Sequence, residues 1–195
     1  MAMGRPRAFD RDKALDQALH VFWANGYEGT SIADLTEAMG INPPSLYAAF
    51  GNKEKLFREA LDRYEGLRDR IMEEAFAAPT AREAMTRLLQ GTADRLSDKD
   101  KPRGCLMVQG ALSCSEECEA VKRDLAARRA GGEVLIRERL KRAKREGDLP
   151  ADADPVALAR FVSTVLQGMA VQAAGGATRK ELRAIADMAL KVWPG

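Results

Sequence analysis

Apolar residues recur at intervals of three and four along almost the whole chain, and this periodicity restricts the fold more than any other feature. Such spacing places the apolar side chains on one face of an α-helix. The composition agrees, because the 195 residues include 33 alanines against nine valines and five isoleucines. Alanine favours helices, whereas β-branched residues line strands. The sequence therefore predicts an all-α protein, and a chain of this length can bury about two thirds of its unfolded surface.

Helix start and stop signals divide the periodic pattern into nine segments. Ser31 followed by Asp34 resembles a capping box, and Asn42 caps a helix whose first two residues are prolines, which need no N–H donor there. The predicted helices span residues 11–25, 31–39, 43–49, 53–79, 80–97, 102–114, 116–146, 155–174 and 178–193. The two glycines at 131–132 are expected to kink or interrupt the seventh helix.

Charge and cysteine content exclude several classes of protein. The formal net charge of +2 neither requires nor forbids a polyanionic partner. Residues 1–10 lack the apolar stretch of a secretory signal, and the most apolar segment, 156–174, is interrupted by three polar residues and is not expected to span a membrane. Cys105, Cys114 and Cys118 are an odd number, which favours free thiols in a reducing compartment. We therefore expect a cytoplasmic protein without a membrane partner.

The most specific motif lies between residues 26 and 53. Two short predicted helices, 31–39 and 43–49, are separated by a tight glycine turn, as in a helix-turn-helix whose second helix enters the DNA major groove. The residues around them read Gly26-Tyr27-Glu28-Gly29-Thr30-Ser31-Ile32, then Met39-Gly40-Ile41, then Ser45-Leu46-Tyr47 with Phe50 and Lys53. This pattern resembles the N-terminal domain of the TetR/AcrR family of bacterial repressors over about residues 9–60.

The resemblance implies both an architecture and a function. A helix-turn-helix DNA-binding domain would occupy residues 1–52, with the start of a connecting helix to about 60, and residues 53–195 would bind an effector and form a homodimer. The chain would be a sequence-specific transcriptional regulator, a repressor released from a palindromic double-stranded DNA operator by a small molecule. It departs from the family pattern where the family often has an alanine and a histidine, at Thr36 and at Ala48 and Ala49.

Net charge does not mark the DNA-binding region, because residues 1–60 hold seven basic groups against eight acidic groups. A few cations and helix N-termini placed against phosphates suffice for such a surface. Tyr47 follows Leu46, which must face inward, so Tyr47 is expected to point outward, and the family resemblance implies a phosphate contact. The residues predicted to contact DNA are Arg5, Arg7, Ser31, Pro43, Pro44, Ser45, Tyr47 and Lys53. The alternative interpretation is that the charges are merely solvated and the prolines only start a helix.

The C-terminal half supplies two further predicted sites. The last two helices are predicted to form a four-helix dimer interface, through Val162, Leu166, Met169, Ala173, Ile185 and Met188. Apolar groups from separate helices are predicted to line an effector cavity, namely Leu61, Tyr64, Leu88, Cys105, Val108, Leu112, Phe161 and Val165. The basic run at 137–145 scatters around its helix and predicts a solvated face.

Cys105 has two interpretations of equal weight: a reactive thiol that senses an electrophile, or a small buried apolar residue. Reactivity would need a nearby cation, and Arg103 is the closest one in sequence. Enzyme chemistry has little support, because His20 is the single histidine and no phosphate-binding glycine loop is present. No cofactor and no metal are expected. The alternatives left open are a cysteine-dependent redox or electrophile-processing protein and an all-α carrier of apolar ligands.

Overall fold

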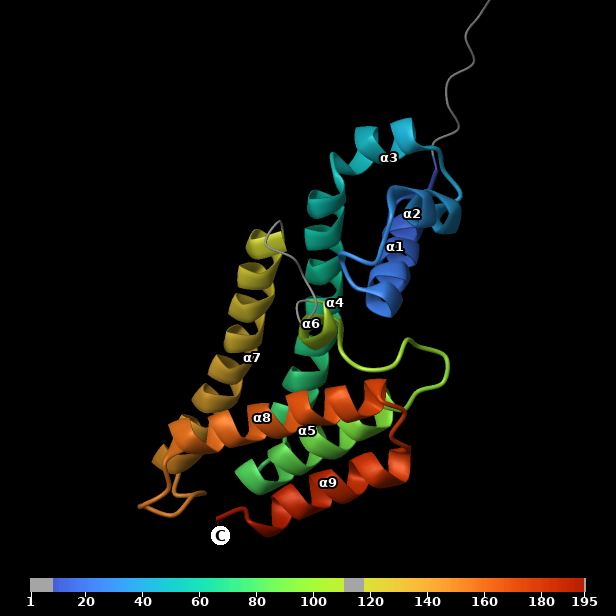
Figure 1. Cartoon of the computed structure of the whole chain (residues 1–195). Helices are drawn as coiled ribbons and strands as arrows, with labels where there is room; N and C mark the ends of the chain where they lie inside the picture. Colours follow the sequence, from blue (N-terminus) through green and yellow to red (C-terminus); the bar gives the residue numbers. More distant parts are fainter. Residues whose placement is uncertain (1–8, 111–117, 195) are drawn as a thin grey trace, which may run out of the picture.

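A computed structural model describes residues 9–110 and 118–194. Within these ranges the chain forms nine α-helices and no strand, which confirms the all-α prediction (Figure 1). The helices are α1 (Arg11–Asn25), α2 (Ile32–Met39), α3 (Pro43–Phe50), α4 (Lys53–Phe76), α5 (Ala81–Leu96), α6 (Leu106–Gln109), α7 (Glu119–Arg145), α8 (Pro155–Ala174) and α9 (Arg179–Lys191).

Cap residues start most helices where the sequence predicts. The N–H of Asp34 donates to Ser31 Oγ at 3.1 Å, and the N–H of Ser31 donates to Asp34 Oδ2 at 2.8 Å, so the capping box of α2 is confirmed. The same arrangement opens α9. At α3 the N–H of Ser45 donates to Asn42 Oδ1 at 2.9 Å. These local bonds satisfy N–H groups that have no partner within the helix.

Two expectations about the middle of the chain are wrong. The helix predicted over 102–114 is reduced to α6, which begins after Cys105 without a side-chain cap; part of that prediction falls on 111–117, outside the described residues. The glycines at 131–132 do not interrupt α7, which runs unbroken for 27 residues. Each glycine costs a helix about 1 kcal/mol, and packing of α7 along α8 offsets this cost.

Buried side chains form two clusters that meet along α4. The first joins α1, α2, α3 and the first half of α4 to α6 and the start of α7. Its aromatic rings interlock, with Phe22 edge-on to Phe57 and Trp23 edge-on to Tyr64, each pair at 4.9 Å. The second cluster joins the end of α4 to α5, α7, α8 and α9. Figure 1 shows the result: α1 to α3 lie at one end, α5, α8 and α9 are stacked at the other, and α4 connects them.

Helix α8 has an unusual composition for a globular protein. Among the described residues it is the one helix long and apolar enough to cross a membrane, with a mean hydropathy of 1.3. The three polar residues thus leave α8 within this limit of length and composition, which by itself does not show a membrane span. Core helices pass the same test of length and composition, and α8 packs against α5, α7 and α9.

Candidate DNA-binding surface and effector cavity

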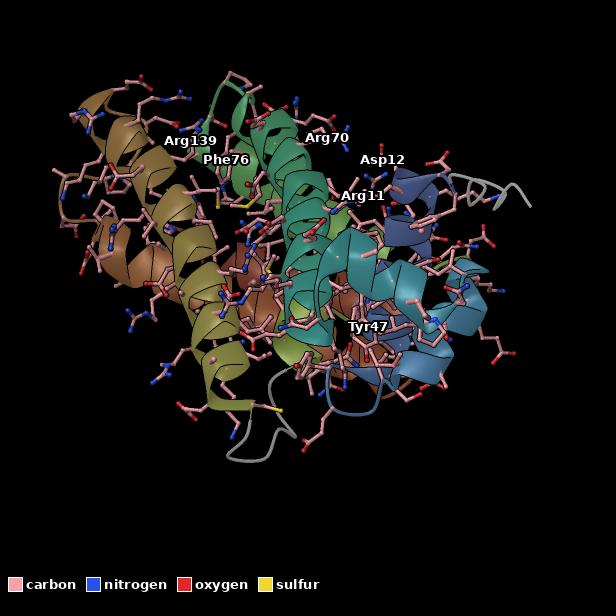
Figure 2. The ribbon with its side chains drawn as sticks, turned by 90° about the horizontal axis from the view of Figure 1, so that it is seen from above. Arg11, Asp12, Tyr47, Arg70, Phe76 and Arg139 are labelled. Carbon is pink, nitrogen blue, oxygen red and sulfur yellow. The ribbon has the colours of Figure 1, made fainter. Side chains whose placement is uncertain are left out.

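Helix α3 presents a solvent-exposed face at the end of the molecule. Leu46 is fully buried, whereas the next residue, Tyr47, is 48% exposed, so the side chain points outward as predicted (Figure 2). Pro43 and Pro44 are also exposed, and Ser45 is half-buried. The prolines carry no N–H, and the N–H of Ser45 already donates to Asn42. This helix start therefore offers apolar rings and one hydroxyl, which suit base edges better than phosphates.

The start of α4, unlike that of α3, has backbone N–H groups that can bind a phosphate. Asn52 Oδ1 accepts the N–H of Lys55 at 2.8 Å. In the part of the chain that the structure describes, the N–H groups of Lys53 and Glu54 donate to nothing, so this positive helix end is available to an anion. Ser31 is exposed at the start of α2. Arg5 and Arg7, the predicted arm, lie outside the described residues.

Lys53 makes a contact that sequence reasoning missed. Its Nζ lies 4.5 Å from the centre of the Tyr27 ring, a cation–π distance. Lys53 also lies near Asp34, whose pKa is lowered mainly by hydrogen bonds from Ser31 and further by the Lys53 charge. The contact with the Tyr27 ring places this cation at the start of α4, next to α3.

Two arginines that join α1 to α4 are already paired with carboxylates. Arg11 binds Glu59 at 2.7 Å and stacks over the Phe50 ring at 4.5 Å. Arg63 donates two hydrogen bonds to Asp16, one of them at 2.8 Å, and these bonds raise the pKa of Arg63. These pairs fix α1 against α4, so Arg11 and Arg63 serve the packing of the domain.

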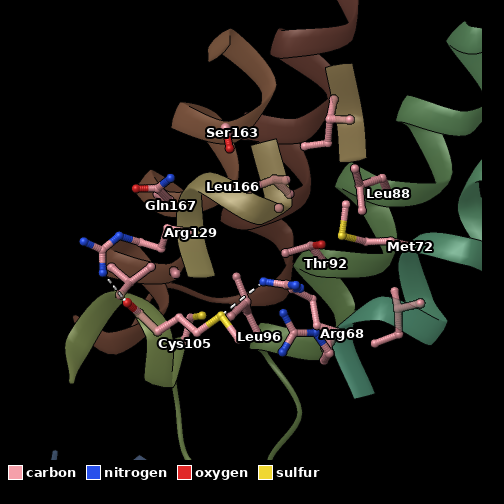
Figure 3. Close-up of a pocket in the computed structure, with 17 residues that line it drawn as sticks. Arg68, Met72, Leu88, Thr92, Leu96, Cys105, Arg129, Ser163, Leu166 and Gln167 are labelled. Carbon is pink, nitrogen blue, oxygen red and sulfur yellow. Dashed lines mark hydrogen bonds between the residues drawn. The ribbon is translucent and has the colours of Figure 1, made fainter. Parts of the chain in front are cut away.

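A cavity of about 100 Å³ lies within the second cluster, on the side where Cys105 and Met107 join it to the first (Figure 3). Helices α4, α5, α6, α7 and α8 each contribute to its wall. The lining residues are Arg68, Ile71, Met72, Leu88, Thr92, Arg95, Leu96, Cys105, Met107, Val108, Arg129, Gly132, Ile136, Ser163, Leu166, Gln167 and Ala170.

The cavity differs from its predicted lining. Leu88, Cys105 and Val108 line it, whereas Leu61 is fully buried in the first cluster. The expectation for Phe161 and Val165 is wrong, because they lie on an outer depression of α8 and α9 instead. Tyr64 is not part of the wall but binds a residue that is, and Leu112 lies outside the described residues. Sequence periodicity gave the helices but not the side that each one turns to the cavity.

Three arginines of the wall were missed by sequence reasoning. Arg95 Nη1 donates to the hydroxyl of Tyr64 at 3.3 Å, and Arg129 Nη1 donates to the backbone oxygen of Met107 at 2.6 Å. Arg95 stands seven residues after Leu88 and so interrupts the apolar stripe of α5, which is the signal that could have found it. Arg103, the cation expected beside Cys105, is exposed and does not line the cavity.

Comparisons with known proteins agree with this architecture. The sequence pattern described as "Bacterial regulatory proteins, tetR family" matches residues 14–60, and that described as "Tetracyclin repressor-like, C-terminal domain" matches residues 81–189. The chain belongs to the TetR family. The predicted resemblance is thereby confirmed, and members of this family are DNA-binding transcriptional regulators rather than enzymes.

Individual TetR-family relatives match over nearly the full length. The HTH-type transcriptional repressor ComR of Escherichia coli (strain K12) is 38% identical over 193 residues, covering 98% of this chain and 92% of ComR. The repressor BdcR of the same strain is 32% identical, covering 95% of this chain and 90% of BdcR. A solved structure of the TetR family regulator CifR, with three cysteine substitutions and a 26-base-pair operator DNA, is 51% identical. It covers 98% of this chain and 100% of CifR, with a TM-score of 0.94.

The exposed apolar surface of this TetR-family chain differs from the predicted dimer interface. Val162 and Met169 are fully buried and Ala173 is nearly so, because these side chains pack inside the protomer, and Leu166 lines the cavity. Their assignment to an outer surface is therefore wrong. One outer depression is formed instead by Phe161, Val165, Ala184, Ile185, Met188, Ala189 and Val192. Since α8 is apolar on several sides, its periodicity could not show which side meets the protomer's own core.

The basic run on α7 is not simply a solvated face. Arg139 is 4% exposed and donates to the backbone oxygens of Phe76 at 3.2 Å and Ala78 at 3.0 Å (Figure 2). These carbonyls belong to the end of α4, where backbone acceptors lack helical partners. Burial lowers the pKa of Arg139, and the neighbouring Arg142 lowers it further. Arg139 thus fastens the end of α4 to α7.

Proposed function

We propose that this TetR-family protein is a cytoplasmic repressor that binds a palindromic operator as a homodimer and leaves it when a small effector fills the cavity. ComR and BdcR are named repressors, and the CifR structure contains operator DNA. The observation that carries the proposal is the exposed α3 face, with Tyr47 pointing outward and the free start of α4 beside it.

In the proposed complex, α3 enters the major groove and the groups around it hold the DNA backbone. Pro43, Pro44 and Ser45 face base edges, while Tyr47 and Lys53 contact phosphates. Ser31 at the start of α2 and the arm with Arg5 and Arg7 add backbone contacts. Base contacts would set the sequence preference, whereas the phosphate contacts would set the affinity and its dependence on salt.

The proposed homodimer forms through the outer depression of α8 and α9. Met188 is 59% exposed and Val192 is 67% exposed, and they adjoin Phe161 and Ile185 on the same surface. Contiguous exposed apolar surface of this kind marks an interface. Pairing of α8 and α9 across a two-fold axis would produce a four-helix bundle. Two α3 helices would then face successive major grooves about 34–36 Å apart, or a multiple of that distance.

Helix α4 is the proposed connection between effector and DNA. Its start presents Lys53 to the DNA, and its later turns supply Arg68, Ile71 and Met72 to the cavity. Glu65 accepts hydrogen bonds from Arg68 at 2.8 Å and from Arg128 at 2.5 Å, so ion pairs link α4 to α7 beside the cavity. A ligand that moves this end of α4 would change the separation of the two α3 helices.

Cys105 gives the cavity a second proposed sensing chemistry. Its thiol interacts with the Tyr64 hydroxyl, and the charge of Arg95 acts on the same hydroxyl. The thiolate would attack the β-carbon of an unsaturated carbonyl compound, forming a C–S bond while solvent protonates the α-carbon. Alkylation would release the protein from DNA, and Cys105→Ser would abolish that response while keeping operator binding. A normal response of Cys105→Ser would show that this residue only packs.

Selection from random duplex DNA tests the proposed function. Purified protein should enrich a palindromic sequence, and fluorescence anisotropy should show much tighter binding to that duplex than to a scrambled one. Tyr47→Ala should weaken binding without changing the thermal unfolding midpoint. Equal affinity for both duplexes would refute the proposal. Turnover of peroxide or a disulfide would then favour a redox enzyme, and ligand binding without DNA affinity would favour a carrier.

A further inference from the structure

The cavity wall carries positive charge that the protein does not neutralise. Three arginines line it, and the lining includes neither aspartate nor glutamate. Arg68 binds Glu65 at 2.8 Å and Asp69 at 2.7 Å. Arg95 and Arg129 differ from it, because neither forms an ion pair with any carboxylate in residues 9–110 or 118–194. A ligand entering the cavity therefore meets two cations without counter-ions.

Among the three arginines of the wall, Arg95 is the least well hydrogen-bonded. Its Nε is buried and makes no hydrogen bond, and the guanidinium donates only to the Tyr64 hydroxyl at 3.3 Å among the described residues. Burial raises the pKa of Tyr64 well above its ordinary value, so the phenol stays neutral and supplies no negative charge. A partly buried cation without an anion is costly, because it has lost part of its hydration.

Hydrogen-bonding groups next to Arg95 are also unused. Thr92 and Ser163 are only 7% and 6% exposed, yet their hydroxyls form no hydrogen bond within the described part of the chain. Thr92 precedes Arg95 by three residues and therefore shares its face of α5. Ser163 and Gln167 approach the cavity from α8 (Figure 3). Together with the Arg95 guanidinium, these hydroxyls at the cavity wall can donate to an oxygen-rich anionic group.

The rest of the wall is apolar and the space is small. Leu88, Leu96, Val108, Ile136 and Leu166 come from four helices and surround the volume of about 100 Å³. An apolar cavity of about 150 Å³ is known to accommodate benzene. One ring or one short branched chain therefore matches the size of this space.

We propose that the cavity binds a compact apolar molecule carrying one carboxylate, with the carboxylate at Arg95 and the apolar body among the leucines. A carboxylate accepts two hydrogen bonds from the planar guanidinium, and the unused hydroxyls can fill its remaining lone pairs. The proposal rests on the proposed function only in taking this ligand as the effector; the binding itself requires no DNA.

Benzoate and benzyl alcohol form a matched probe pair, because they share the ring and differ in charge. Isothermal titration of the DNA-free protein should show that benzoate binds at least about tenfold tighter than benzyl alcohol, since a charged hydrogen-bonded pair adds at least one factor of ten. Equal binding of both probes, or binding of neither, would overturn the proposal. This comparison uses only the unmodified protein.

Two substitutions locate the carboxylate. Arg95→Gln should reduce benzoate affinity to that of benzyl alcohol, while Arg103→Gln, outside the cavity, should leave both affinities unchanged. Circular dichroism checks that each variant is folded, and Arg129→Gln provides a second cavity variant if Arg95→Gln unfolds. Retention of the full benzoate preference in folded Arg95→Gln would place the anion elsewhere and contradict the assignment.

The outcome separates this inference from the proposed function. If benzoate binds but operator binding is absent, the ligand class stands and the repressor proposal fails. If a selected operator binds tightly but benzoate does not bind, the repressor proposal stands and the ligand class fails. Cys105→Ser should retain benzoate binding, because the proposed contact is ionic and not covalent.

Discussion

The helix-turn-helix end of the molecule and the cavity differ in how far their polar side chains are hydrogen-bonded or paired within the protein. In the first region Ser31 and Asn42 cap their helices, and Arg11 and Arg63 are paired with carboxylates. In the second region Arg95 has no carboxylate partner and its Nε makes no hydrogen bond, and the hydroxyls of Thr92 and Ser163 make none among the described residues. Both regions are well packed, so the difference does not reflect poor folding. It shows which region is complete by itself and which one needs a ligand.

The largest expected effect on stability comes from a substitution in the aromatic core of the helix-turn-helix end. Phe57 is fully buried, with its ring 4.9 Å from Phe22 and 5.0 Å from Tyr27. Phe57→Ala should lower the free energy of unfolding by about 3–5 kcal/mol, because it leaves a cavity in a rigid aromatic core. Urea unfolding followed by circular dichroism measures this. The control is Tyr47→Ala, an exposed aromatic of the same domain, and a loss below about 1 kcal/mol for Phe57→Ala would contradict the description of this core.

One substitution made in both regions sharpens the comparison. Thr30 is 1% exposed and donates to the oxygen of Gly26 at 2.6 Å, whereas Thr92 is 7% exposed and makes no such bond among the described residues. Thr30→Val should cost about 1–2 kcal/mol of unfolding free energy. Thr92→Val should change it by less than about 0.5 kcal/mol, since no hydrogen bond is lost. If both substitutions lowered the unfolding free energy equally, Thr92 would have a hydrogen-bond partner, and this part of the cavity wall would not be free to bind a ligand.

The DNA surface provides the next test. Lys53→Ala should weaken binding to all duplexes and reduce the slope of log affinity against log salt by about one, because one phosphate contact is lost. Substitutions at Ser45 should instead change the preference among sequences. Anisotropy titrations at several salt concentrations measure both effects. Lys141→Ala serves as a control, because Lys141 lies on α7 and pairs with Glu138 at 2.9 Å; an unchanged slope in Lys53→Ala would remove the phosphate assignment.

The smallest expected effect concerns the ion pair between α5 and α9. Asp94 accepts hydrogen bonds from Arg183 at 2.8 Å and 2.6 Å, and these lower the pKa of Asp94. A lowered carboxyl pKa stabilises the fold above the unfolded value of 3.8, and this stabilisation is lost as the pH falls through the lower folded value. Since both side chains are at least one third exposed, Asp94→Asn should cost only about 0.2–1 kcal/mol at pH 7.

Unfolding free energies of wild type and Asp94→Asn across pH 7 to 2 check this sign. The difference should be constant near neutral pH and disappear in acid. Asp152→Asn, at an exposed position, should show no difference at any pH. A difference that grows in acid would contradict the assigned direction of the pKa.

Helix positions were largely predictable from sequence because their signals are local. Ser31, Asp34 and Asn42 form hydrogen bonds with backbone groups three residues away. The neighbouring residues therefore suffice to predict where α2 and α3 begin. The short α6 was overestimated because periodicity extends past the point where α6 stops. For α7, glycine propensity predicted a break that packing against α8 prevents.

The cavity was less predictable because it depends on how the helices are rotated about their axes. Val162 and Val165 are both apolar residues of α8, yet the first is buried in the protomer and the second lies in the outer depression. Proximity in sequence suggested Arg103 as the partner of Cys105, whereas the folded chain brings Arg95 to the cavity from α5. Only the arrangement in space shows which arginines lack a carboxylate.

The most direct test is whether ligand binding in the cavity and operator binding at the helix-turn-helix end are coupled. Operator affinity is measured by anisotropy with and without saturating benzoate, and benzoate affinity is measured with and without saturating operator. The account predicts that each ligand weakens the binding of the other by the same factor, as coupled equilibria require. Two affinities that do not respond to the other ligand would contradict the account, because α4 would then transmit nothing between the cavity and α3.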